Sequence, residues 1–74
     1  MAKVSTITVA AETCIRLAKE KIISDKDYYL YDGSTYKRMV AGYSLLMCTE
    51  QAKIYNVNAN AVAGALRRIL TSNK

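Results

Sequence analysis

Positively charged and amide side chains gather near the C-terminal end of this 74-residue chain, and side chains of these types are the ones that commonly contact phosphates and bases in nucleic-acid-binding proteins. Residues 51–74 contain no acid and four cations, a net charge of +4, namely Lys53, Arg67, Arg68 and Lys74. The whole chain carries +5, so nearly all of its excess positive charge lies in this segment. Cations supply most of the non-specific affinity of a protein for DNA. The charge alone favours DNA only weakly, because it also keeps a small protein soluble.

The residues that would position these cations form a pattern of two helices joined by a tight turn. Ala52 is small enough for the two helices to approach closely, and Val57 would fill the space between them. Asn56 suits the turn itself, because asparagine is the non-glycine residue that best tolerates a left-handed backbone. The second helix repeats apolar residues at helical spacing, at Val62, Ala65, Leu66 and Ile69. This layout predicts a helix-turn-helix, which sets its second helix into the DNA major groove.

Capping residues are available at both helix starts. Asn58 or Asn60 can cap the second helix, and Thr49 can cap the first. Two short amphipathic helices in any small bundle would give similar spacings, and helix-turn-helix patterns are degenerate. The turn residue Asn56, the small residue Ala52, the buried Val57 and the apolar stripes of both helices all agree, and this agreement favours a helix-turn-helix.

The rest of the chain predicts an all-α fold, a small bundle of about four helices that forms one domain over residues 1–74. A helix is expected at about 9–24, capped by Thr8, with a buried stripe at Ala11, Cys14, Ala18 and Ile22. Another is expected at about 35–47, with an apolar face at Tyr36, Met39, Val40, Tyr43, Leu46 and Met47.

The segment between these two helices has two interpretations. Aromatic residues beside Asp32-Gly33 allow a short β-hairpin near residues 28–37. Alternatively the segment turns directly into the next helix, with Ser34 as its cap.

Enzymatic chemistry is not expected. The chain has no histidine, no glycine-rich phosphate loop and no recognisable nucleophile with a base, so no catalytic, cofactor-binding or metal-binding residue is predicted. Cys14 and Cys48 are too few for a disulfide framework and fit buried thiols in a reduced, cytoplasmic protein. No apolar run is long enough to span a membrane, so a membrane is not an expected partner.

The helix-turn-helix segment resembles the C-terminal DNA-binding domain of the sporulation-initiation response regulators of endospore-forming bacteria. It resembles the Cro-type phage repressors more loosely. The resemblance covers residues 50–70 and rests on Ala52, Lys53, Tyr55, Asn56, Ala59, Val62, Ala65, Leu66, Arg67 and Leu70. No receiver domain is present, so phosphorelay control is not implied.

The resemblance implies DNA-contacting positions along the second helix and its cap, at Asn58, Ala59, Asn60, Ala63, Gly64 and Arg67. Base recognition normally needs long polar side chains in mid-helix, whereas Ala63 and Gly64 offer only van der Waals contact. Asn60 has the groups to read adenine bidentately. Lys53, Arg67 and Arg68 are expected on phosphates.

Two functions therefore stay open. The first is a small transcriptional regulator of bacterial or phage type that binds double-stranded DNA as a homodimer, with the helix at residues 59–70 in the major groove. Residues 28–31 or the helix containing Tyr43 would form its dimer surface. The second is a protein-interaction module, such as a phage-encoded inhibitor or accessory subunit that binds a host protein, in which the helix-turn-helix is a packing surface.

Overall fold

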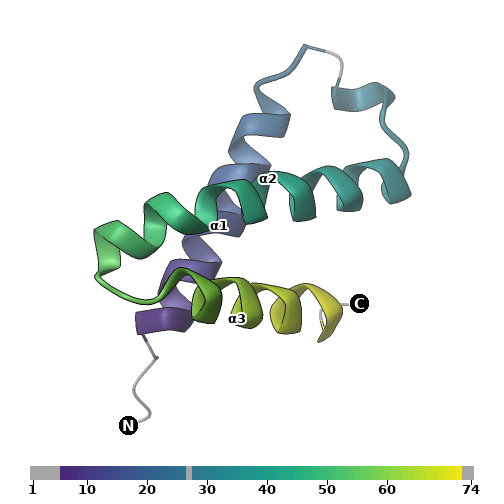
Figure 1. Ribbon diagram of the computed structural model, residues 1–74. Helices are drawn as coiled ribbons and strands as arrows, with labels where there is room; N and C mark the ends of the chain where they lie inside the picture. The colour runs from purple at the N-terminus through teal and green to yellow at the C-terminus, as the bar shows by residue number, and fades with distance from the viewer. Residues whose placement is uncertain (1–5, 27, 73–74) are drawn as a thin grey trace, which may run out of the picture.

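Three α-helices make up most of the computed structural model, which describes residues 6–26 and 28–72 (Figure 1). Along the chain these helices are α1 (Thr6–Ile23), α2 (Gly33–Tyr55) and α3 (Ala59–Ser72). A single 3-10 turn, η1 (Tyr28–Leu30), lies between α1 and α2. No strand occurs in the described part of the chain, so the predicted all-α class is confirmed.

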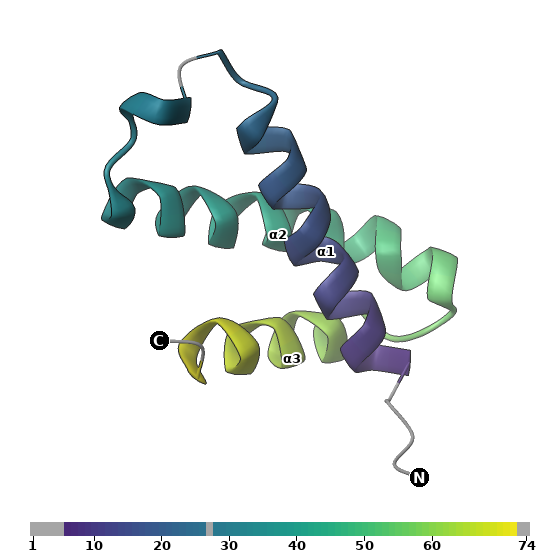
Figure 2. The same cartoon turned by 180° about the vertical axis from the view of Figure 1, so that it is seen from behind.

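The three helices form two layers. α3 runs back in the direction opposite to α2, and α1 crosses both of them (Figure 1). Seen from behind, α1 lies in front of this pair (Figure 2). Each pair of helices is in contact, so one core serves all three. α2 is the longest element, and its 23 residues span roughly 34 Å at 1.5 Å per residue.

The core is built mostly from small side chains. The predicted stripe on α1 is confirmed, since Ala11, Cys14, Ala18 and Ile22 are all buried. The cluster where the three helices meet consists of Ala10, Ala11, Cys14, Cys48, Ala52, Val62, Ala65 and Leu66. Small residues at a crossing let the helix backbones approach closely, and Leu66 supplies the largest fully buried side chain of this cluster.

The expected break between two helices near Cys48 is wrong, and the bundle has three α-helices instead of four. α2 continues through Thr49, which lies inside the helix and does not cap it. Neither glycine nor proline occurs between residues 43 and 55, so nothing in the sequence stops the helix there. A buried stripe at four-residue steps, Val40, Ser44, Cys48 and Ala52, runs through the expected break and holds α2 to the core.

The apolar face predicted for this helix is also displaced. Val40 is buried and Tyr36, Met39, Tyr43 and Met47 are half-buried, but Leu46 is 78% exposed. Ser44 takes the central core position, because its hydroxyl donates to the Val40 carbonyl at 2.6 Å and so loses no hydrogen bond on burial.

The β-hairpin considered for residues 28–37 is absent, and η1 and the start of α2 occupy this segment. The cap of α2 is Asp32, not Ser34. Its carboxylate accepts from the Thr35 N–H at 2.7 Å, which holds the pKa of Asp32 below its usual value. At the other predicted cap, Thr8 lies within α1, which already includes Thr6.

Candidate nucleic-acid interface

The turn between α2 and α3 has the left-handed residue that the sequence predicts. Asn56 adopts φ 57° and ψ 50°, and it is the one non-glycine residue with positive φ in the described ranges. The Asn56 N–H donates to the Lys53 carbonyl at 3.2 Å, and the Val57 N–H donates to the Ala52 carbonyl at 2.9 Å. These two hydrogen bonds form a Schellman motif, which ends α2 sharply and fixes the direction in which the chain leaves it.

Asn58 caps the start of α3, and this decides between the two asparagines considered. Its side-chain oxygen accepts from the Asn60 N–H at 2.8 Å and from the Ala61 N–H at 3.3 Å. Its main-chain carbonyl accepts from the Val62 N–H at 3.1 Å. The cap therefore uses the amide oxygen of Asn58, while the Asn60 side chain is exposed and is not the cap.

One face of α3 is buried against the other helices. Val62 and Leu66 are fully buried and Ala65 nearly so. Ala59 and Ala63 are half-buried and pack against the same core. The resemblance assigns both Ala59 and Ala63 to DNA contact. Because they lie at the edge of the core, DNA could reach only part of each side chain.

The opposite face of α3 is exposed along its whole length. This outer face of α3 consists of Asn60, Gly64, Arg67, Arg68 and Thr71, all exposed. Their spacings of three, four and seven place them on one side of the helix, facing away from the core. The structure thus brings together Asn60, Gly64, Arg67 and Arg68 from the predicted set.

Gly64 lies at the centre of the outer face of α3. A Cβ built at this position meets no atom within 4 Å, so the fold does not require glycine there. Glycine in an exposed helix costs about 1 kcal/mol relative to alanine. Its presence leaves a bare stretch of backbone that another molecule can approach closely.

Lys53 lies in the last turn of α2, three residues before Asn56. Its side chain is exposed, and a cation at this end interacts favourably with the helix dipole. It belongs to a different helix from Arg67 and Arg68, so the predicted phosphate contacts come from both sides of the turn. Lys74 lies outside the described residues.

A second group of cations was missed in the sequence, because its members are far apart in the chain. Lys19 from α1 and Lys37 and Arg38 from α2 border a groove of about 580 Å³. Its apolar lining is Ile15, Tyr36, Val40, Ala41 and Leu70, with Gly33 at one end. Since Leu70 belongs to α3, all three helices contribute to this groove, while its cations come from α1 and α2. The signal in the sequence was Lys37-Arg38 on a face that the predicted helix left exposed.

The two thiols do not add a chemical site. Cys14 and Cys48 are both buried and both unpaired. Burial, followed by the neighbouring Cys48 thiol, raises the pKa of Cys14 to about 11. Burial also raises the pKa of Cys48. Both groups are therefore protonated at neutral pH, and a thiol is a far weaker nucleophile than a thiolate.

Between residues 6 and 72, with residue 27 aside, no cluster of three histidine, cysteine or acidic side chains is placed to hold a metal ion. Over the same residues, no helix combines the length and the apolar character needed to span a bilayer.

The chain matches no protein-family model, no curated protein and no solved structure.

Proposed function

We propose that this protein is a small DNA-binding transcriptional regulator of bacterial or phage type, with a helix-turn-helix formed by the end of α2, the turn at residues 56–58 and α3. The observation that carries the proposal is the outer face of α3. It is exposed along its length, lies opposite the core, holds two arginines and no acid, and begins at a capped helix end. An α-helix with such a face fits the major groove, which is about 12 Å wide.

Phosphate contacts provide most of the binding in this proposal. Arg67 and Arg68 are adjacent on the outer face of α3, and Lys53 adds a cation before the turn. No acid occurs in residues 51–74 to repel the DNA backbone. Each cation that neutralises a phosphate releases a counterion, so the affinity depends steeply on salt.

Base recognition is restricted to few positions. The exposed Asn60 amide has a donor and an acceptor for the adenine edge, and the amide NH₂ of Asn58 is not used by the cap. Gly64 carries no side chain to read a base, but it allows the helix backbone to lie close to the groove floor. We therefore expect modest sequence preference together with strong non-specific binding.

Titration of a random 20-base-pair duplex at several salt concentrations tests this proposal. Each phosphate contact contributes about 0.9 to the slope of log affinity against log salt. The double variant Arg67→Ala and Arg68→Ala loses two such contacts. The magnitude of its slope should therefore be smaller than that of the wild type by roughly 1.8. The matched control removes two exposed cations outside α2 and α3, with Arg16→Ala and Lys26→Ala.

Two results would count against DNA binding. One is no measurable association with duplex at low salt. The other is an equal loss of slope in the Arg67/Arg68 variant and in the Arg16/Lys26 control, because that would show that net charge matters and the outer face of α3 does not.

A protein-interaction module is the second candidate, and one observation favours it. Leu46 and Ile54 on α2 are 78% and 67% exposed. Large apolar side chains on the outside of a small domain are typical of protein contact surfaces when they cluster, and Leu46 borders a shallow hollow together with Met39, Gly42 and Tyr43.

A further inference from the structure

The groove between the first half of α2 and the end of α3 is a concave site to which all three helices contribute. In two opposite views these two segments lie on the same side of α1 (Figure 1 and Figure 2). α2 lines the groove with one helical stripe from Gly33 to Ala41, α1 lines it with Ile15 and Lys19, and α3 lines it with Leu70. We call this site of about 580 Å³ the three-helix groove.

The interior of the three-helix groove is apolar and partly exposed to water. Val40 is buried, but Ile15, Tyr36 and Leu70 beside it are only half-buried. A Cβ added at Gly33 meets no atom within 4 Å, so the groove is open where α2 begins. Contact between apolar side chains and water is unfavourable. A molecule with an apolar body would therefore gain free energy by covering these side chains.

The rim of the three-helix groove is positive. Lys19, Lys37 and Arg38 border it, and no acidic side chain of the described residues lines it. Among residues 6–26 and 28–72, none of these three cations has an ion-pair partner. The acid next to the groove in the sequence is Asp32, and its carboxylate is engaged in accepting from the Thr35 N–H. A negative charge at the rim would therefore be attracted without displacing an existing partner.

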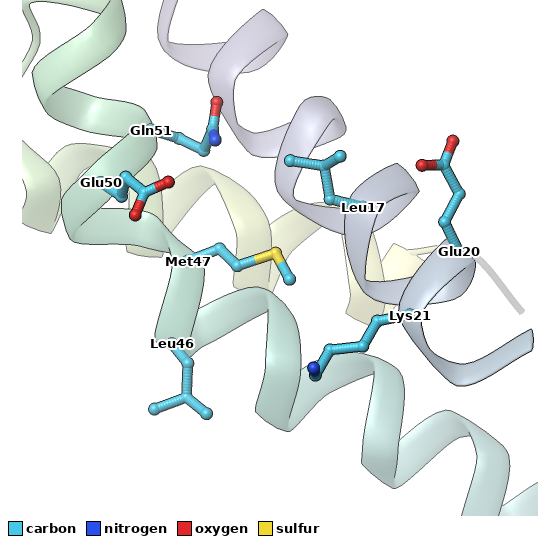
Figure 3. A pocket seen from close by; sticks show the side chains of 7 residues that line it. All are labelled: Leu17, Glu20, Lys21, Leu46, Met47, Glu50 and Gln51. Carbon is cyan, nitrogen blue, oxygen red and sulfur yellow. The ribbon is translucent and has the colours of Figure 1, made fainter. Parts of the chain in front are cut away.

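A second hollow, between α1 and α2, shows that this single sign of charge is specific to the three-helix groove. It has a similar volume of about 550 Å³, but Glu20 and Glu50 line it together with Lys21 (Figure 3). An anion in this second hollow would meet two carboxylates and one ammonium group. Size alone therefore does not distinguish the two sites, whereas charge does.

We propose that the three-helix groove binds a small amphipathic carboxylate, a molecule with an apolar body and one carboxylate group. The body covers Ile15, Val40 and Leu70, and the carboxylate lies at the rim, where cations from α1 and α2 attract it. The volume falls in the range of about 300–1,000 Å³ that is typical of small-molecule sites. The groove has nine lining residues, whereas a stable protein interface uses about 20–30 residues a side. Its size therefore favours a small molecule over a protein.

This inference goes beyond the proposed DNA binding and does not depend on it. Arg67 and Arg68 do not line the three-helix groove, so a ligand there leaves the outer face of α3 exposed. A ligand that contacts three separate helices binds the folded chain and not the unfolded one. Binding should therefore raise the thermal midpoint of unfolding in the absence of DNA.

Titration of the full chain with sodium octanoate, followed by amide chemical shifts, tests the proposal. Octanoate should bind with a dissociation constant below about 1 mM. It should shift the amides of Ile15, Ala41 and Leu70 more than those of Leu17 and Met47, which line the second hollow. Octylammonium has the same apolar chain and the opposite charge, so it should bind about tenfold more weakly. Acetate has the charge without the apolar body and should cause no such shifts.

Two sets of variants separate the rim from the interior. Lys19→Gln combined with Lys37→Gln should raise the octanoate dissociation constant about tenfold. The matched control, Lys21→Gln with Lys53→Gln, removes the same charge from exposed positions outside the groove and should leave that constant unchanged. Ala41→Leu should weaken octanoate binding because the larger side chain occupies the groove. Urea denaturation without ligand shows that each variant is folded.

Four results would overturn the proposal. Octanoate may cause no amide shifts at about 10 mM. Octylammonium may bind as tightly as octanoate, or the control pair may lose as much affinity as the rim pair. The fourth is binding to phosphatidylglycerol vesicles that requires Lys19 and Lys37 while free octanoate does not bind, because that would assign the groove to a membrane surface. All of these measurements omit DNA, so they are independent of the DNA salt slope.

Discussion

The outer face of α2, formed by Met39, Gly42, Tyr43, Leu46 and Glu50, and the outer face of α3 have the same plan and opposite chemistry. Each lies opposite the core, and each has a central glycine, Gly42 or Gly64, whose surroundings are empty. Around Gly42 the neighbours are mainly apolar, with Leu46 the most exposed. Around Gly64 they are polar and positive, with Arg67 and Arg68. The backbone can be approached closely on both faces, and the surrounding side chains decide whether an apolar helix or a polyanion approaches it.

The two glycines also have a cost that the isolated domain does not recover. Each costs about 1 kcal/mol relative to alanine in a helix interior. A 74-residue domain is only marginally stable, so this loss is a noticeable part of its stability. We infer that the glycines serve contacts outside the chain, and the following changes test how far the two faces are independent.

The largest effect is expected from Leu66→Ala, which removes the core side chain behind the outer face of α3. Leu66 is fully buried at the meeting point of the three helices. Its truncation should lower the free energy of unfolding by about 2–5 kcal/mol. Urea denaturation followed by circular dichroism measures this. DNA binding should fall in parallel with the folded fraction, and DNA binding that persists as the folded fraction falls would show that the core does not position the outer face of α3.

A smaller effect is expected from Asn56→Ala, which acts on the turn that orients α3. Alanine in a left-handed conformation is disfavoured by about 1–2 kcal/mol, while Asn56→Gly should keep or raise stability. Thermal denaturation of the two variants provides the comparison. Equal destabilisation by alanine and glycine would show that the left-handed backbone at this position is not what limits the turn.

Asn58→Ala should destabilise the chain by about 1 kcal/mol, because it removes the acceptor for the first N–H groups of α3. Asn58→Ser is the matched control, since serine also caps helices. Amide hydrogen exchange over residues 59–62 should rise in the alanine variant and stay slow in the serine variant. A rise confined to α2 would contradict the assignment of Asn58 as the cap of α3.

The smallest effect is expected from Ile54→Lys. Ile54 is exposed and lies in the last turn of α2, outside the hollow at Gly42. The substitution should change the free energy of unfolding by less than about 0.5 kcal/mol. Urea denaturation measures this change. A loss of more than about 1 kcal/mol would show that Ile54 packs on the fold despite its exposure.

The turn and α3 were predicted well because local chemistry determines them. Asparagine at a helix end usually indicates a left-handed backbone, which Asn56 adopts. Asn58 caps the backbone N–H of Asn60, only two residues further along the chain. Val62 and Leu66 repeat at the helical period on a short helix with one buried face. Each of these inferences depends on neighbours within a few residues.

The errors on α2 arose where distant contacts decide the outcome. Thr49 was predicted to cap a helix, but a threonine can cap only the first residues of a helix. Thr49 lies in the interior of α2, which begins at Gly33. Leu46 was predicted to be a core residue, but it is exposed, and Ser44 and Cys48 are buried instead. Which side of α2 is buried depends on where α1 packs, and the residues near Leu46 in the sequence do not determine that. The exposed face of Leu46 could be recognised only in three dimensions.

The small side chains of the core have a consequence for how this sequence can vary. Where Ala11, Ala52 and Ala65 meet, truncation removes almost nothing, but even one added methyl group must displace a helix. In a library of random variants, the depleted substitutions at these positions should be enlargements such as alanine to valine. The surface positions of α2 and α3 can meanwhile drift in charge and size, so related chains should differ in what they bind long before they differ in how they fold.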